Sequence, residues 1–130
     1  MIGTSKIKAA ELPVEKWDIL DRTFGYALRI VQLYQKLEKA DVSRILGKQL
    51  LRAGTSVGAN VQEAQGGQSK ADFISKISIA QKECLESLYW LRLLEKADLI
   101  SKPELKDLID ETGQLAKILS SILISSKRTP

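Results

Sequence analysis

Hydrophobic residues recur at steps of three and four along most of the chain, which is the spacing of one face of an α-helix. Four segments show this spacing, at about residues 13–38, 42–65, 70–97 and 102–126. Prolines occur only at positions 13, 103 and 130, so none interrupts a segment beyond its first turn. No alternating pattern typical of a β-strand competes with this spacing. The pattern therefore predicts an all-α chain of four helices.

The same spacing predicts which side chains face the core. The expected core positions are Trp17, Leu20, Phe24, Ala27, Leu28, Val31 and Leu37 in the first segment, Leu46, Leu50, Ala53, Val57, Val61 and Ala64 in the second, Phe73, Ile77, Ala80, Cys84, Leu88, Leu91 and Leu94 in the third, and Leu105, Leu108, Leu115, Leu119 and Ile122 in the fourth. The third segment carries six more apolar residues, Ile74, Ile79, Leu85, Tyr89, Trp90 and Leu93. One face cannot hold them all, so we expect a second side to be buried against another subunit, with Tyr89 and Trp90 at that interface.

Short connections between long helices favour an up-down-up-down antiparallel four-helix bundle, and 130 residues are enough for one such domain spanning 1–130. Signals for helix ends fall between the segments. We expect Asp41 to cap the second helix, Gly66 and Gly67 to end it, and capping boxes at Ser69 with Asp72 and at Ser101 with Glu104.

Three glycines, Gly47, Gly54 and Gly58, lie inside the second predicted helix, where each costs up to ~1 kcal/mol relative to alanine. A phosphate-binding loop of the Walker type would need a lysine after its last glycine, whereas Ala59 follows Gly58. The pattern instead favours close packing of a neighbouring helix, with close approach of a ligand as the alternative.

Asn60 and Glu63 lie near the apolar face of the second helix, where an unpaired polar group would be costly to bury. We expect a structural polar network that joins them to the third helix through Glu83 or Glu86. The alternative is a carboxylate metal site of the di-iron type, but such sites use histidine and the chain has none. We therefore expect no metal and no cofactor.

The absence of histidine also removes the commonest general base near neutral pH. Cys84, the one cysteine, lies in phase with the core residues of its helix and is expected to be structural. We therefore expect a protein that is not an enzyme. An enzyme acting through Glu63, Glu83 or Lys82 is a remote alternative.

The chain has a formal net charge of +4 and a sequence pI near 9.2, which permits nucleic-acid binding without requiring it. Arg44, Lys48 and Arg52 recur every four residues and form a basic stripe, either a solvated face or a surface for phosphates. No apolar run is long enough to cross a bilayer and the N-terminus lacks a secretory signal, so we expect a cytoplasmic protein.

Several stretches resemble one bacterial family of four-helix bundles, named after the 23S ribosomal RNA intervening-sequence protein. The resemblance rests on residues 49–64, with a specific core from Arg52 to Ala64, and on residues 21–24, 69–76 and 83–94. It implies a homopentameric ring with a central channel. It also implies kinship with accessory proteins of diversity-generating retroelements, which bind nucleic acid and a reverse transcriptase.

By that resemblance, Arg44, Lys48 and Arg52 become candidates for nucleic-acid binding, since five copies of this chain would carry a charge of about +20. The sequence thus predicts an oligomeric protein that binds RNA or DNA, with a reverse transcriptase as a further candidate partner. The alternative is a structural or adaptor oligomer that contacts only proteins.

Overall fold

Four long helices form the computed structural model, which describes residues 14–37, 39–100 and 102–128. They are α2 (Val14–Lys36), α3 (Asp41–Gln65), α4 (Lys70–Lys96) and α5 (Lys102–Arg128). Each end lies within two residues of the range predicted from the sequence. The described residues contain no β-strand, so the prediction of an all-α chain with four helices is confirmed.

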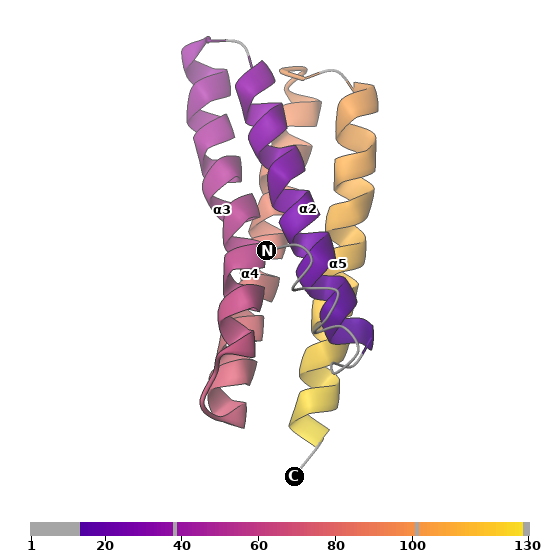
Figure 1. Cartoon of the computed structure of the whole chain (residues 1–130). Coiled ribbons are helices and arrows are strands. Elements are labelled where there is room, and N and C mark those ends of the chain that lie inside the picture. Colours follow the sequence, from indigo (N-terminus) through magenta and orange to yellow (C-terminus); the bar gives the residue numbers. More distant parts are fainter. Residues whose placement is uncertain (1–13, 38, 101, 129–130) are drawn as a thin grey trace.

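The helices alternate in direction and pack side by side as an antiparallel bundle (Figure 1). The contact between α3 and α4 is the most extensive, α3 also packs along α2, and α4 packs along α5. The seam between α2 and α5 is the smallest of the four. Among the described residues α2 and α4 do not pack on each other, so these two helices lie diagonally across the bundle and run in the same direction.

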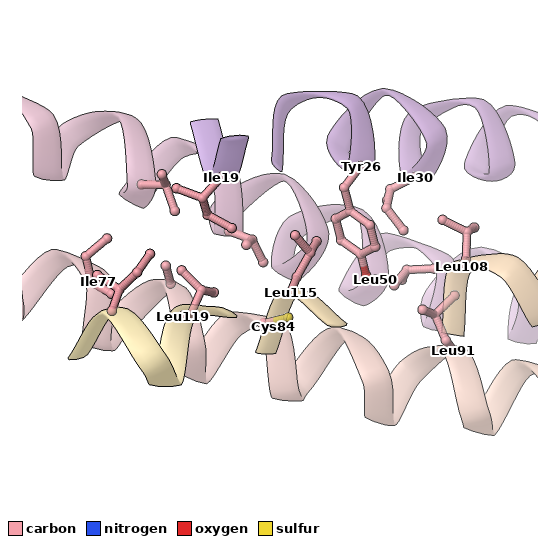
Figure 2. Packing of buried hydrophobic residues seen from close by; sticks show 14 of the residues in the cluster. Ile19, Tyr26, Ile30, Leu50, Ile77, Cys84, Leu91, Leu108, Leu115 and Leu119 are labelled. Carbon is pink, nitrogen blue, oxygen red and sulfur yellow. The ribbon is translucent and has the colours of Figure 1, made fainter. Parts of the chain in front are cut away.

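The core is a continuous layer of aliphatic side chains between the helices, with Tyr26 and Cys84 among them (Figure 2). Full burial of a large aliphatic side chain stabilises a fold by about 1.5–3 kcal/mol, so this layer is the main source of stability. On α3, α4 and α5 the predicted faces are correct. Only Leu46, Phe73 and Leu88 of the predicted positions there are partly rather than fully buried.

The predicted inward face of α2 was wrong in part. Leu20 packs against the core, and the side chain of Trp17 lies outside the described residues. Phe24 and Leu28 are 57% and 49% exposed. The residues that α2 buries instead are Ile19, Thr23, Tyr26, Ile30 and Leu33. This helix has two apolar faces, and the spacing of hydrophobic residues alone does not choose between them. The inward face carries a tyrosine and a threonine. Both can be buried because their hydroxyls are hydrogen-bonded.

The helix ends agree with the sequence signals at two places and differ at one. Ser69 caps α4 by accepting a 3.1 Å hydrogen bond from the backbone N–H of Asp72, as predicted. Gly66 follows the last residue of α3, also as predicted. Asp41 does not cap α3, because the helix begins at Asp41 itself and its N-cap is Ala40, which makes no side-chain hydrogen bond. The carboxylate of Asp41 still lies in the first turn, where the helix dipole favours a negative charge. The Ser101 and Glu104 signal falls outside the residues whose side chains are described.

Close packing explains the glycines of α3. A Cβ on Gly54 would lie 2.9 Å from Cγ1 of Ile30, and a Cβ on Gly58 would lie 3.1 Å from the backbone oxygen of Thr23. A Cβ on Gly47 would overlap Leu37. All three glycines therefore let α3 approach the chain of α2 and its connection closely, and the packing interpretation is confirmed.

Candidate nucleic-acid interface

The three basic residues of the stripe lie on successive turns of α3 and all are exposed to solvent. They are not equivalent. The guanidinium of Arg52 forms an ion pair with Glu83 of α4 at 3.2 Å and a second, shorter one with Glu86. Glu86 also accepts a 2.9 Å hydrogen bond from the indole nitrogen of Trp90.

These ion pairs join α3 to α4, and they pair the charge of Arg52 with carboxylates of its own chain. A phosphate would have to compete with two carboxylates for the same guanidinium. Because half of the Arg52 side chain is exposed, each of these ion pairs contributes only about 0.2–1 kcal/mol to stability. Arg52 is therefore the weakest of the three predicted phosphate ligands.

Arg44 and Lys48 have no such partner. Both side chains are exposed, and neither forms an ion pair with any residue that the structure describes. They lie one turn apart, which is about 6 Å along the helix axis. These two residues are the free cations of the stripe.

Val42 and Ile45 lie on the same half of α3 and are among the most exposed large apolar residues of the described chain. Sequence reasoning missed them as surface residues of interest. The signal was present for Ile45, which is apolar and falls outside the core spacing of its helix, whereas Val42 precedes Leu46 by four residues and fits that spacing. Ile45 lies three residues before Lys48, on the same side of the helix, and gives the surface beside Lys48 an apolar as well as a basic character.

The predicted polar network has different pairings. The side-chain amide of Asn60 donates to the backbone oxygen of Ser56 at 2.8 Å, within its own helix. Glu63 pairs with Lys76 of α4 at 2.9 Å. Glu83 and Glu86 face Arg52 instead.

The antiparallel register of α3 and α4 explains the error. Residues near the end of α3 face the beginning of α4, so Glu63 meets Lys76, whereas Glu83 lies farther along α4 and meets a residue earlier in α3. Neither Asn60 nor Glu63 is buried, so neither needs a partner in the core.

The two aromatic residues proposed for an interface have unequal environments. Tyr89 is exposed, whereas Trp90 is half-buried against the core of its own chain. Their rings meet edge to face with centroids 5.0 Å apart. A shallow surface depression is lined by Tyr89, Arg92, Leu93 and Lys96.

The thiol of Cys84 and the phenol of Tyr26, two potential nucleophiles in the core, are stabilised in their protonated forms. The thiol of Cys84 donates to the backbone oxygen of Thr112 at 3.3 Å, and the hydroxyl of Tyr26 lies 2.7 Å from Oγ1 of Thr112. Burial, with a smaller contribution from the charge of Glu111, raises the pKa of Cys84 to about 12. Burial also raises the pKa of Tyr26 above its ordinary value. Burial and the raised pKa values therefore favour a structural role for these two side chains over a nucleophilic one.

The described residues lack two kinds of feature. No group of three or more histidine, cysteine, aspartate or glutamate side chains converges there in the manner of a metal site. None of the helices combines the length and hydropathy that a membrane span requires.

The architecture defines an all-α protein, a four-helix antiparallel bundle with a basic and apolar surface on α3. The model of the family described as the 23S rRNA-intervening sequence protein matches residues 15–121. The chain belongs to that family.

One similar solved structure is a protein of unknown function from the S23 ribosomal protein family of Bacteroides thetaiotaomicron, determined by crystallography at 1.70 Å. It is 38% identical to this chain, with a TM-score of 0.79, and the match covers 84% of this chain and 97% of that one. No curated protein matches the chain significantly.

Proposed function

We propose that this protein is a non-enzymatic homo-oligomer, a ring of five copies, that binds RNA or DNA through Arg44 and Lys48 of each copy. The observation that carries the proposal is the pair of exposed cations on successive turns of α3 that form no ion pair with any described residue. Each cation that meets a phosphate releases bound counterions, which is the main source of affinity in sequence-independent binding.

Assembly supports this proposal because several copies of a weak site bind one nucleic acid more tightly than a single copy does. Two cations on one copy give little affinity, but five copies present ten such residues and a formal charge of about +20. The family is named for an intervening sequence of ribosomal RNA, which makes structured RNA the first ligand to test. Its resemblance to retroelement accessory proteins makes a reverse transcriptase a candidate protein partner. The cytoplasm is the compartment in which such ligands would meet this protein.

The chemistry of the chain supports a binding role rather than catalysis. The sequence contains no histidine, and the thiol is buried with a raised pKa. Glu63 and Glu83, the carboxylates of the enzymatic alternative, are paired with Lys76 and Arg52 and so already serve to join α3 to α4.

Fluorescence anisotropy with labelled structured RNA and labelled duplex DNA tests the proposal. The test variant carries Arg44→Glu and Lys48→Glu. Its matched control carries Lys70→Glu and Lys117→Glu, which change the net charge equally at two other exposed positions. We expect the test variant to lose at least tenfold in affinity and the control to lose much less. Equal losses, or no binding by the parent protein, would remove the assignment to this surface.

The protein-only adaptor is the second candidate, and the exposed Val42 and Ile45 favour it. An apolar pair among cations suits a protein partner with apolar and acidic side chains. Failure of the parent protein to bind either nucleic acid above a charge-matched control protein would move the conclusion to this adaptor.

A further inference from the structure

Two exposed apolar pairs lie on opposite corners of the bundle. Phe24 and Leu28 lie one turn apart on α2, and Leu85 and Tyr89 lie one turn apart on α4, where they are 53% and 59% exposed. Because α2 and α4 are diagonal, the two pairs face away from each other. We call them the α2 patch and the α4 patch.

The two patches lie at nearly the same height along the bundle. The side chains of Tyr26 of α2 and Cys84 of α4 both contact Thr112 of α5, which places the two residues within the reach of a side chain of the same level. Counted from this level, Leu28 stands two residues above it, while Leu85 and Tyr89 stand one and five residues above it. Since α2 and α4 run in the same direction, Leu28 of a copy placed alongside would therefore lie near Leu85 and Tyr89 of its neighbour.

The charges are complementary at one edge of the two patches. The exposed stripe of α4 carries Lys82, Arg92 and Lys96, all basic. The exposed side of α2 carries Asp21 below its apolar pair, and the basic residues Arg29 and Lys36 above Leu28. In the same side-by-side arrangement Asp21 falls within one turn of Lys82, so opposite charges meet at that edge of the contact.

Pairing of the α4 patch with a second α4 patch is unfavourable. A two-fold axis through the midpoint of Leu85 and Tyr89 would bring Lys82 of one copy against Arg92 of the other, twice over, and like charges repel. Such a dimer would also leave the α2 patch exposed. A head-to-tail contact covers both patches and places Asp21 rather than a cation near Lys82, while Lys36 then lies within one turn of Arg92 and Lys96 at the other edge.

We infer that the α4 patch is the docking surface for the α2 patch of another copy of this chain, so that each copy donates one face and receives one. This contact is heterologous, and repetition of it closes into the ring of the proposed function when successive copies are also rotated relative to one another. The second apolar face of α2 thereby has a role: it is the part of the helix that another subunit covers.

Complementation between two single variants tests this inference. Phe24→Glu disables the α2 patch and Tyr89→Glu disables the α4 patch, and both positions are exposed, so the fold should tolerate the changes. Light scattering coupled to size-exclusion chromatography gives the mass. We expect each variant alone to be a folded monomer, and a 1:1 mixture to form a dimer, because one intact α2 patch and one intact α4 patch remain. Ile45→Glu, an equally exposed apolar position on α3, is the control and should keep the parent mass.

Circular dichroism verifies folding, and Leu28→Ser with Leu85→Ser provides a second, milder pair. A mixture that stays monomeric, or a Phe24→Glu variant that keeps the parent mass, would overturn the docking assignment while leaving the oligomer of the proposed function intact. A monomeric parent protein would overturn both.

Discussion

Replacing Gly54 and Gly113 separately by alanine isolates the contribution of close helix packing. Both glycines lie inside helices, so both substitutions gain the same helix propensity, up to about 1 kcal/mol. Their surroundings differ. A Cβ on Gly113 meets nothing within 4 Å, whereas a Cβ on Gly54 lies 2.9, 3.1 and 3.4 Å from three atoms of Ile30.

The expected magnitudes follow from this difference. Gly113→Ala should stabilise the protein by about 1 kcal/mol, which is the propensity gain alone. At Gly54 the added methyl group meets a β-branched side chain with restricted rotation, and overpacking of this kind costs about 1–3 kcal/mol. Gly54→Ala should therefore range from neutral to about 2 kcal/mol destabilising. The difference between the two variants equals the packing cost, about 1–3 kcal/mol.

Urea unfolding followed by circular dichroism at one fixed protein concentration measures both variants. The concentration must be held constant because assembly contributes to apparent stability. Gly25→Ala repeats the open-space control on α2, since a Cβ there also meets nothing within 4 Å. The packing interpretation of the α3 glycines fails if Gly54→Ala is stabilised as much as the two control variants.

Three further predictions concern the polar contacts. Tyr26→Phe removes the hydrogen bond to Thr112 and should lower the free energy of unfolding by about 1 kcal/mol in urea titrations, with no loss expected if that hydroxyl were solvated. Arg52→Gln removes two ion pairs and should cost no more than about 2 kcal/mol, and it should weaken nucleic-acid binding less than Arg44→Gln does, since its charge is already paired; equal effects of the two variants on binding would contradict this ranking. The buried thiol of Cys84 has a pKa raised from 9.0 to about 12, so it stays protonated while the unfolded thiol ionises. This contribution to stability is complete below pH 9 and is lost between pH 9 and 12, so Cys84→Ala should show a shallower alkaline fall in unfolding free energy than the parent protein. An equally steep fall would show that the thiol does not titrate in this way.

The fold was largely predictable because periodic hydrophobic spacing, capping residues and short connections all favoured the same four helices. The inward face of α2 was not predictable, because Tyr26 becomes a good core residue only when Thr112 of α5 provides a hydrogen-bond partner. Thr23 can be buried there because its hydroxyl donates to the backbone oxygen of Ile19 in its own helix. Pattern reasoning treats such residues as polar and selects the fully apolar face containing Phe24 and Leu28 instead. The error has a physical cause: both faces of α2 are apolar enough to be buried, so hydrophobicity alone does not select one of them.

The candidate site was only partly predictable for a related reason. Helical spacing places Arg44, Lys48 and Arg52 on one stripe, but it does not say what lies across from them. The register between α3 and α4 decides that Arg52 meets Glu83 and Glu86. Register depends on packing along the whole length of both helices, so local sequence reasoning could not assign these pairs.

The salt dependence of binding to structured RNA tests the central claim most directly. The logarithm of the binding constant should fall linearly with the logarithm of the salt concentration, with a slope that grows by roughly one unit for each phosphate contacted. Neutralising Arg44 and Lys48 with Arg44→Gln and Lys48→Gln should reduce that slope by at least about two units, because several copies contribute. A slope that the double variant leaves unchanged would contradict the assignment of this surface to nucleic acid.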